Sequence, residues 1–200
     1  MAREGRPPTG GGAGERAVRA DARRNRARIL DAAEAVFAEQ GASASTEAVA
    51  AHAGVAIGTV FRHFPTKPEL LQAVVMHLLD RLITEVDAMV GKQDAVTALF
   101  EFCAQVMEVS ARNRAVFARL EETGVRVRVG DALARLRPGI DLLLERAQKA
   151  GTVRDDLLPA ELTALLAALC HEALTDAWSK PFRQRALTLL FDGMRPTAKR

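Results

Sequence analysis

The sequence predicts an all-α protein in which a small three-helix N-terminal domain precedes a larger helical domain. Apolar residues recur at i, i+3 and i+4 through most of the 200 residues, which is the period of one helix face. Glycine and proline separate these stretches. The one alternating stretch, Val125–Val129, is short and has no obvious partner strand, so we expect it to be helical or irregular.

The composition favours a globular protein of the cytoplasm. Hydrophobic residues make up 48% of the chain and charged residues 26%, which is ordinary for a globular domain. The absence of an apolar run of about 18 residues argues against a membrane span, and the N-terminus does not resemble a secretory signal. The two cysteines, Cys103 and Cys170, make no disulfide framework, which fits a reducing compartment.

Excess positive charge is confined to the first third of the chain. Residues 1–67 hold ten Lys and Arg against seven Asp and Glu, whereas the remainder is balanced at 18 against 18. A local basic excess indicates an anionic partner, nucleic acid first. Residues 1–22 are rich in Gly, Pro, Ala and Arg without an apolar face, so we expect a disordered basic arm there.

Three short-range signals define the domain expected at residues 23–67. A first helix begins near Arg23, and Gly41 stands where a left-handed C-cap is expected. Ser45 or Thr46 caps a second helix that ends near Ala53. A third helix follows at about residues 57–63.

Residues 45–64 (STEAVAAHAGVAIGTVFRHF) have the spacing of a helix-turn-helix motif. Ala50 is small where the two helices approach, and Gly54 suits the positive φ of the turn. Val60 packs the second helix back onto the first. The alternative interpretation of this spacing is a helical hairpin with no role in DNA binding.

Pro65 and Pro68 mark the end of this domain, and residues 68–194 form the larger helical domain before a tail at 195–200. A long helix covers about residues 67–90. Further helices are expected at about 93–110, 113–128, 131–150, 159–178 and 182–193. The dipeptide Pro138-Gly139 is expected to kink or split the segment 131–150.

The segment from about residue 24 to 75 resembles the N-terminal domain of the TetR family of transcriptional repressors. The matched positions are Ile29-Leu30, Ala32-Ala33, Phe37, Gly41, Ala53-Gly54-Val55, Gly58-Thr59, His63-Phe64, Lys67 and Leu70. The resemblance implies a homodimer with three DNA-binding helices and a larger helical effector-binding and dimerisation domain. It also implies binding of a palindromic operator and its release by a small ligand. Two positions depart from the family pattern: Ala56 replaces a common Ser or Thr, and Phe61 replaces a usual Tyr.

We expect the third helix to read the major groove, where contacts to base edges set sequence specificity. Ile57 and the Thr59 methyl suit thymine methyl groups, Gly58 permits close approach, and Arg62 suits guanine or phosphate. The arginines before residue 29 either reach the minor groove or form a solvated basic face. The resemblance supports a phosphate contact by the lysine that begins the next helix. The complete set of candidate DNA-binding residues is Arg23, Arg24, Arg26, Arg28, Thr46, Ala56, Ile57, Gly58, Thr59, Phe61, Arg62, His63 and Lys67.

The second domain carries no catalytic constellation, metal-ligand cluster or cofactor motif. Its aromatic, sulfur-containing and leucine side chains suit a cavity for a small, largely apolar effector. The candidate ligand-binding residues are Phe100, Cys103, Met107, Phe117, Leu120, Leu144, His171 and Trp178. For each of them the alternative is a simple core residue. The surroundings of the two cysteines do not indicate the lowered pKa that a redox sensor needs.

Leucine and alanine cover more than one face of the helix near residues 160–174. One face can therefore pack within the subunit and another against a second copy, as the resemblance also implies; the alternative is a helix buried in a monomer. The leading hypothesis is a ligand-responsive repressor that binds double-stranded operator DNA as a homodimer. A non-specific architectural DNA-binding protein is the alternative, and the neutral second domain argues against it. An enzyme is disfavoured because no paired carboxylates or activated nucleophile stand at useful spacing.

Overall fold

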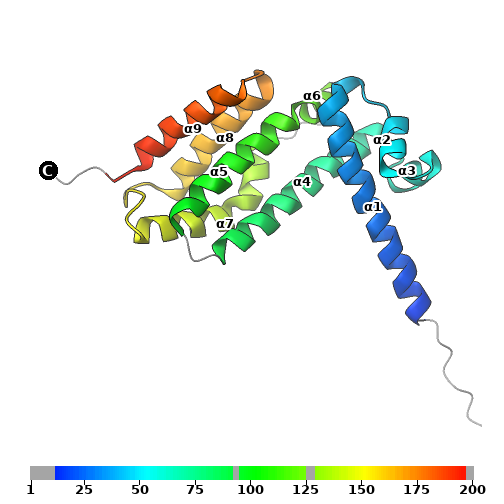
Figure 1. Cartoon of the computed structure of the whole chain (residues 1–200), viewed down its shortest axis with the longest axis horizontal. Helices are drawn as coiled ribbons and strands as arrows, with labels where there is room; N and C mark the ends of the chain where they lie inside the picture. The colour runs from blue at the N-terminus through cyan, green and yellow to red at the C-terminus, as the bar shows by residue number, and fades with distance from the viewer. Residues whose placement is uncertain (1–11, 92–94, 125–128, 197–200) are drawn as a thin grey trace, which may run out of the picture.

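The computed structural model describes residues 12–91, 95–124 and 129–196, and within these ranges the chain is all-α, as predicted (Figure 1). The elements are α1 (Gly12–Gln40), a 3-10 turn η1 (Gly41–Ser43), α2 (Thr46–Ala53), α3 (Ile57–His63), α4 (Lys67–Val90), α5 (Ala95–Arg112), α6 (Arg114–Glu122), α7 (Val129–Lys149), α8 (Pro159–Thr175) and α9 (Lys180–Met194).

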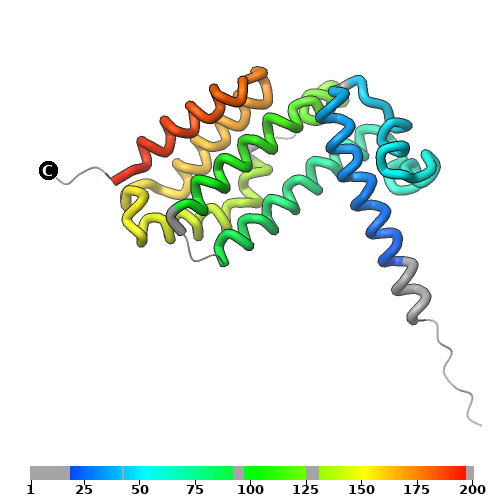
Figure 2. Tube along the Cα trace, viewed as in Figure 1, coloured from blue at the N-terminus to red at the C-terminus, as the bar shows by residue number. Residues whose placement is uncertain are grey.

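Two apolar clusters form the core, and α4 contributes to both. The first cluster joins α1, α2, α3, the first half of α4 and α6, with Phe37, Val60 and Leu120 fully buried. The second joins the last part of α4 with α5, α7, α8 and α9 around residues such as Phe102 and Ile140. The packing boundary therefore falls inside α4 rather than at residue 67, and α6 belongs partly to the N-terminal cluster. Figure 2 shows α4 running from the N-terminal helices into the larger domain.

Helix α1 is longer than the sequence analysis expected. It begins at Gly12, so residues 12–22, expected to belong to a disordered arm, are helical; residues 1–11 lie outside the described ranges. The physical reason is composition: after Gly14 the segment consists mainly of Ala, Arg and Glu, which are good helix formers. The Gly and Pro content that suggested disorder is concentrated before that point.

Helix α7 is continuous through Pro138. The expectation that the helix splits at this position is therefore wrong. The proline lies on the exposed side of the helix. Its neighbour Gly139 faces α4, where an added Cβ would lie 2.5 Å from Cγ1 of Val86. The dipeptide thus serves close packing of α7 on α4 rather than a break. Of the alternating stretch, residues 125–128 lie outside the described ranges, and Val129 begins α7.

Candidate nucleic-acid interface and apolar cavity

Helices α2 and α3 form the predicted helix-turn-helix. The Ser45 hydroxyl accepts a hydrogen bond from the Ala48 amide over 3.1 Å and so caps α2. Gly54 ends α2 with φ 63° and ψ 39°, a left-handed conformation in which glycine carries no penalty. Ala50 and Val60 are buried between the two helices. The short-range signals in the sequence therefore describe the local structure correctly.

Most of α3 faces outward because Val60 is its one fully buried residue. Gly58, Phe61 and Arg62 are exposed, as is Ala56 just before the helix; the half-buried members of the predicted set are Ile57, Thr59 and His63. An added Cβ at Gly58 would meet nothing within 4 Å. Ala56 provides no side-chain cap for α3, as the departure from the family pattern implies. This helix presents the face that the sequence analysis assigned to base contacts.

Two of the four predicted arginines make contacts inside the domain. Arg28 donates from Nη2 to the carbonyl of Ala53 over 2.6 Å and so satisfies the C-terminal end of α2. The Arg26 guanidinium lies 5.1 Å from the ring centroid of Phe64, the residue that ends α3. The other two, Arg23 and Arg24, are exposed. Arg23 donates from Nε to a backbone carbonyl one turn earlier over 3.4 Å, and Arg24 pairs with Asp21, also on α1.

Lys67 is engaged with the protein in the same way. Its Nζ donates to the carbonyl of Ala44 over 2.6 Å and lies 5.5 Å from the ring centroid of Phe37. Burial lowers the pKa of this ammonium group, and the positive charge of Arg119 lowers it further. Lys67 therefore ties the start of α4 to the end of η1. Thr46, another of the candidate DNA-binding residues, is half-buried at the start of α2.

An ion pair and a hydrogen bond that were not predicted from the sequence join α1 to α4. Arg81 Nη1 lies 2.7 Å from Oε2 of Glu34, a carboxylate that is only 7% exposed. His77 Nε2 lies 2.8 Å from Oδ1 of Asp31. The sequence does contain a sign of these contacts. Two acidic residues stand three apart on α1 and two basic residues four apart on α4, and each spacing places the pair on one helix face. These contacts fix the orientation of the DNA-binding helices on α4.

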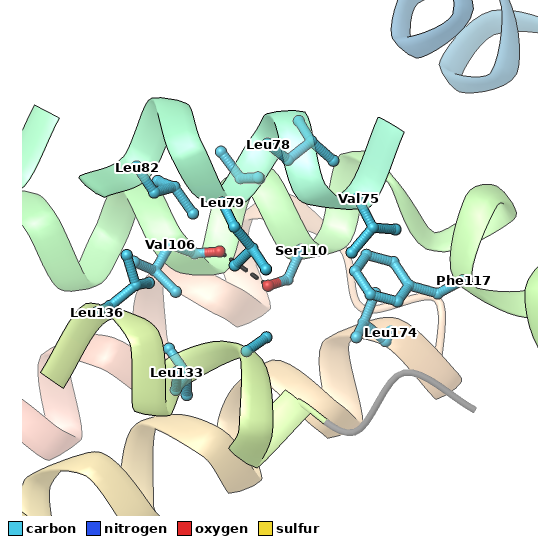
Figure 3. A pocket seen from close by; sticks show the side chains of 12 residues that line it. Val75, Leu78, Leu79, Leu82, Val106, Ser110, Phe117, Leu133, Leu136 and Leu174 are labelled. Atoms are coloured by element: carbon cyan, nitrogen blue, oxygen red, sulfur yellow. Dashed lines mark hydrogen bonds between the residues drawn. The ribbon is translucent and has the colours of Figure 1, made fainter. Parts of the chain in front are cut away.

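An apolar cavity of about 40 Å³ lies between α4, α5, α6, α7 and α8 (Figure 3). Ser110 is the one polar side chain in its lining, and its hydroxyl donates to the carbonyl of Val106 over 2.9 Å. That hydrogen bond uses the hydroxyl proton, so none of the described lining side chains offers a free donor. The lining is Val75, Leu78, Leu79, Leu82, Val106, Val109, Ser110, Phe117, Ala132, Leu133, Leu136 and Leu174.

The predicted ligand-binding set and this lining share only Phe117. The fully buried members of the set, away from the cavity, are Cys103, Met107, Leu120 and Leu144. Phe100 and Trp178 are half-buried and pack against other aromatic rings at 4.6 and 4.7 Å between centroids. His171 is exposed on α8, so it is neither a cavity residue nor the core histidine that was its alternative. The lining residues outside the predicted set stand mainly on α4, α5 and α7.

The geometry defines a class: a helical DNA-binding protein whose helix-turn-helix is carried on a larger helical domain. Residues 29–74 match the family described as "Bacterial regulatory proteins, tetR family". Residues 94–196 match "Transcriptional regulator SbtR-like, C-terminal domain". The chain therefore belongs to the TetR family of transcriptional regulators, and it is a DNA-binding regulator rather than an enzyme.

Known regulators of this family are similar to the chain over most of their length. A TetR transcription regulatory protein from Mycobacterium vanbaalenii is 33% identical with a TM-score of 0.72, over 89% of this chain and 99% of that one. A TetR transcriptional regulator from Streptomyces coelicolor is 29% identical with a TM-score of 0.71, over 86% and 99%. The HTH-type transcriptional regulator UidR of Escherichia coli (strain K12) is 23% identical over 175 residues, 84% of this chain and 89% of that protein.

Two further properties hold for the described residues. None of their helices is long and apolar enough to cross a membrane. Across the same residues, no three His, Cys, Asp or Glu side chains gather in an arrangement that could hold a metal ion.

Proposed function

We propose that the protein is a ligand-responsive repressor that binds a palindromic operator as a homodimer and releases it when a small apolar molecule binds. The observation that carries this proposal is the position of the cavity. Val75, Leu78 and Leu79 of α4 line the cavity and also belong to the cluster that packs the DNA-binding helices. Occupation of the cavity therefore acts on residues that hold the helix-turn-helix.

Helix α6 makes a second connection of the same kind. Phe117 lines the cavity, while Val116 and Leu120, its neighbours on α6, are buried in the N-terminal cluster. A shift of α6 away from the cavity would therefore be transmitted to α1 and η1. Two elements, α4 and α6, share this geometry.

The size of the cavity supports a change of shape on binding. Sites for drug-sized ligands occupy about 300–1,000 Å³, whereas this cavity holds about 40 Å³. A drug-sized ligand therefore enters this cavity only if the surrounding helices separate. Ligand then favours a conformation in which the two recognition helices no longer match successive major grooves, about 34–36 Å apart. The apolar lining selects a largely apolar effector.

The outer face of α8 and α9 supports a homodimer. Leu165 of α8 and Leu189 of α9 are 48% and 57% exposed, and both line one open groove between these helices. Exposed leucines that share a groove are typical of a protein–protein interface. A second copy of the same two helices would cover them in a four-helix arrangement.

Operator binding is tested by selecting random duplex DNA on the purified full chain at near-physiological salt and sequencing the bound fraction. The proposal expects one enriched inverted repeat. Uniform affinity that only follows salt concentration would instead support a non-specific architectural protein. The release step is tested by screening small apolar molecules for thermal stabilisation and then measuring operator affinity. A molecule that occupies the cavity without lowering that affinity contradicts the repressor mechanism.

The dimer is tested with the double variant Leu165→Glu/Leu189→Glu. Burying two carboxylates in an apolar interface is strongly unfavourable, so sedimentation should show a monomer that binds the palindrome much more weakly than the parent. Leu142→Glu is the matched control, because Leu142 is 41% exposed but lies on α7. A double variant that sediments like the control would place the dimer contact elsewhere.

A further inference from the structure

Helix α1 extends well beyond the domain to which it belongs. Among its described side chains, which begin at Arg19, the first buried residue is Ile29. The segment from Gly12 to Arg28 therefore precedes the first described residue that packs in the core. At 1.5 Å per residue this segment, here called the basic extension, is about 25 Å long. Figure 1 shows α1 projecting past α2 and α3 at this end.

The described side chains of the basic extension carry mostly positive charge. Residues 19–28 carry five arginines against the single acidic residue Asp21. Each of these arginines is exposed. The segment is therefore a projecting helix with a net charge suited to a polyanion.

One row of side chains along α1 is basic in its first half and apolar in its second half. Spacings of three or four residues place on one helix face, in order, Arg19, Arg23, Arg26, Leu30, Ala33 and Phe37. The last three are buried against the rest of the domain, whereas Arg19 and Arg23 are exposed. The face is thus apolar where it has a domain to pack on and basic where it has none.

This row points to the side of the molecule that carries the recognition helix. Arg26, at the junction, lies 5.1 Å from the ring centroid of Phe64, which ends α3. Arg28 stands half a turn away, on the opposite face of α1 from this row, where it donates to the carbonyl that ends α2. Arg19 and Arg23 therefore share a helix face with Arg26, the residue that contacts the end of α3.

We propose that the basic extension lies along duplex DNA outside the operator half-site, where Arg19 and Arg23 contact backbone phosphates. This inference rests on the operator binding proposed above and adds a second, sequence-independent contact to it. A helix is about 10–12 Å across with its side chains, whereas the minor groove is about 6 Å wide. The extension therefore crosses phosphates as a rod, instead of entering the minor groove as a flexible arm would.

The test compares two duplexes that share the selected operator, one with flanks of two base pairs and one with flanks of twelve. Dissociation constants are measured against salt concentration for the parent chain and for Arg19→Gln/Arg23→Gln. The parent should bind the long duplex about tenfold more tightly. The slope of the logarithm of affinity against the logarithm of salt concentration should steepen by about 3 to 4. This is the expectation for four arginines per dimer at about 0.9 per phosphate.

The variants separate the possible outcomes. The double variant should bind both duplexes as the parent binds the short one, while Arg112→Gln, an exposed arginine at the end of α5, should behave like the parent. Equal affinity of the parent for the two duplexes overturns the inference, and operator binding stands. Failure to select any operator overturns the proposed function instead. If the helix-breaking variant Ala22→Pro keeps the full flank effect, the charge acts from a flexible segment and the rod is wrong.

Discussion

The guanidinium of Arg28 donates to the carbonyl of Ala53 across 2.6 Å, and this hydrogen bond fixes α1 against the last turn of α2. Arg28 Nη2 also lies 3.3 Å from where a Cβ would stand on Gly54. The arginine therefore occupies the corner of the helix-turn-helix. A residue chosen from the sequence as a DNA contact thus has a structural partner within its own domain.

This contact predicts that Arg28→Gln lowers the free energy of unfolding. Hydrogen bonds to charged groups contribute about 1.5–3 kcal/mol, and part-exposure reduces this, so we expect a loss of about 1–2 kcal/mol in urea denaturation. Arg24→Gln is the control on the same helix, because its exposed pair with Asp21 should change stability by less than about 0.5 kcal/mol. Equal stability of the two variants would mean that the Ala53 contact is not stabilising.

The open surroundings of Gly58 predict a variant that loses DNA binding without losing its fold. Because nothing lies within 4 Å of an added Cβ, Gly58→Glu introduces no clash within the subunit. Its carboxylate would face phosphates and base-edge acceptors, so operator affinity should fall at least about 100-fold, on the scale of the several kcal/mol that like-charge contacts cost.

Two further measurements make the Gly58 result interpretable. Gly58→Ala tests the effect of size without charge and should retain more affinity than Gly58→Glu. Thermal unfolding and sedimentation of Gly58→Glu should match the parent. Retained operator affinity in Gly58→Glu would show that α3 does not face the DNA.

The close approach of Gly139 to Val86 predicts that α7 cannot accept a side chain at this position. A Cβ would stand 2.5 and 2.7 Å from the two methyl carbons of Val86, so α4 or α7 has to move in Gly139→Ala. Overpacking of this kind costs about 1–3 kcal/mol. Val86→Ala removes both methyl groups, and in the double variant Gly139→Ala/Val86→Ala the cost of the alanine should largely disappear. Additive effects in this cycle, followed by thermal unfolding, would contradict direct contact.

The helix-turn-helix could be predicted because local rules determine it. Ser45 caps the helix that follows it, and the Gly54 conformation is required by the turn whatever surrounds it. The roles of Arg28 and Lys67 could not be predicted in the same way. A basic side chain on a helix suits a phosphate and a backbone carbonyl equally, and only the packed structure shows that each of these two donates to a carbonyl.

The cavity could not be predicted because it depends on how each helix is rotated about its axis. On α5 the predicted Cys103 and Met107 point into the filled core, while the adjacent face with Val106 and Ser110 lines the space. The two faces are equally compatible with helical periodicity. The sequence likewise did not indicate α1 as far back as Gly12, because the Gly and Pro residues at the start of the chain outweighed the helix-forming Ala, Arg and Glu that follow Gly14.

Burial of both thiols predicts inert cysteines and a loss of stability at alkaline pH. Desolvation raises the pKa of Cys103 from 9.0 to about 12, with a smaller contribution from Cys170, whose own pKa burial raises to about 11. Between pH 9 and those values the unfolded chain releases thiol protons that the folded protein retains, so stability falls as pH rises. The double variant Cys103→Ala/Cys170→Ala should lose this part of the decline.

The same burial predicts how the thiols respond to alkylation. At pH 8 both are protonated in the folded protein, and the thiolate is the reactive form. Iodoacetamide should therefore modify neither cysteine in the native state and both in concentrated urea, as counted by mass spectrometry. The unfolded sample is the control for reagent and time. Native labelling at the rate of the unfolded chain would mean that a thiolate is accessible, and oxidant sensing through these two residues would then have to be considered again.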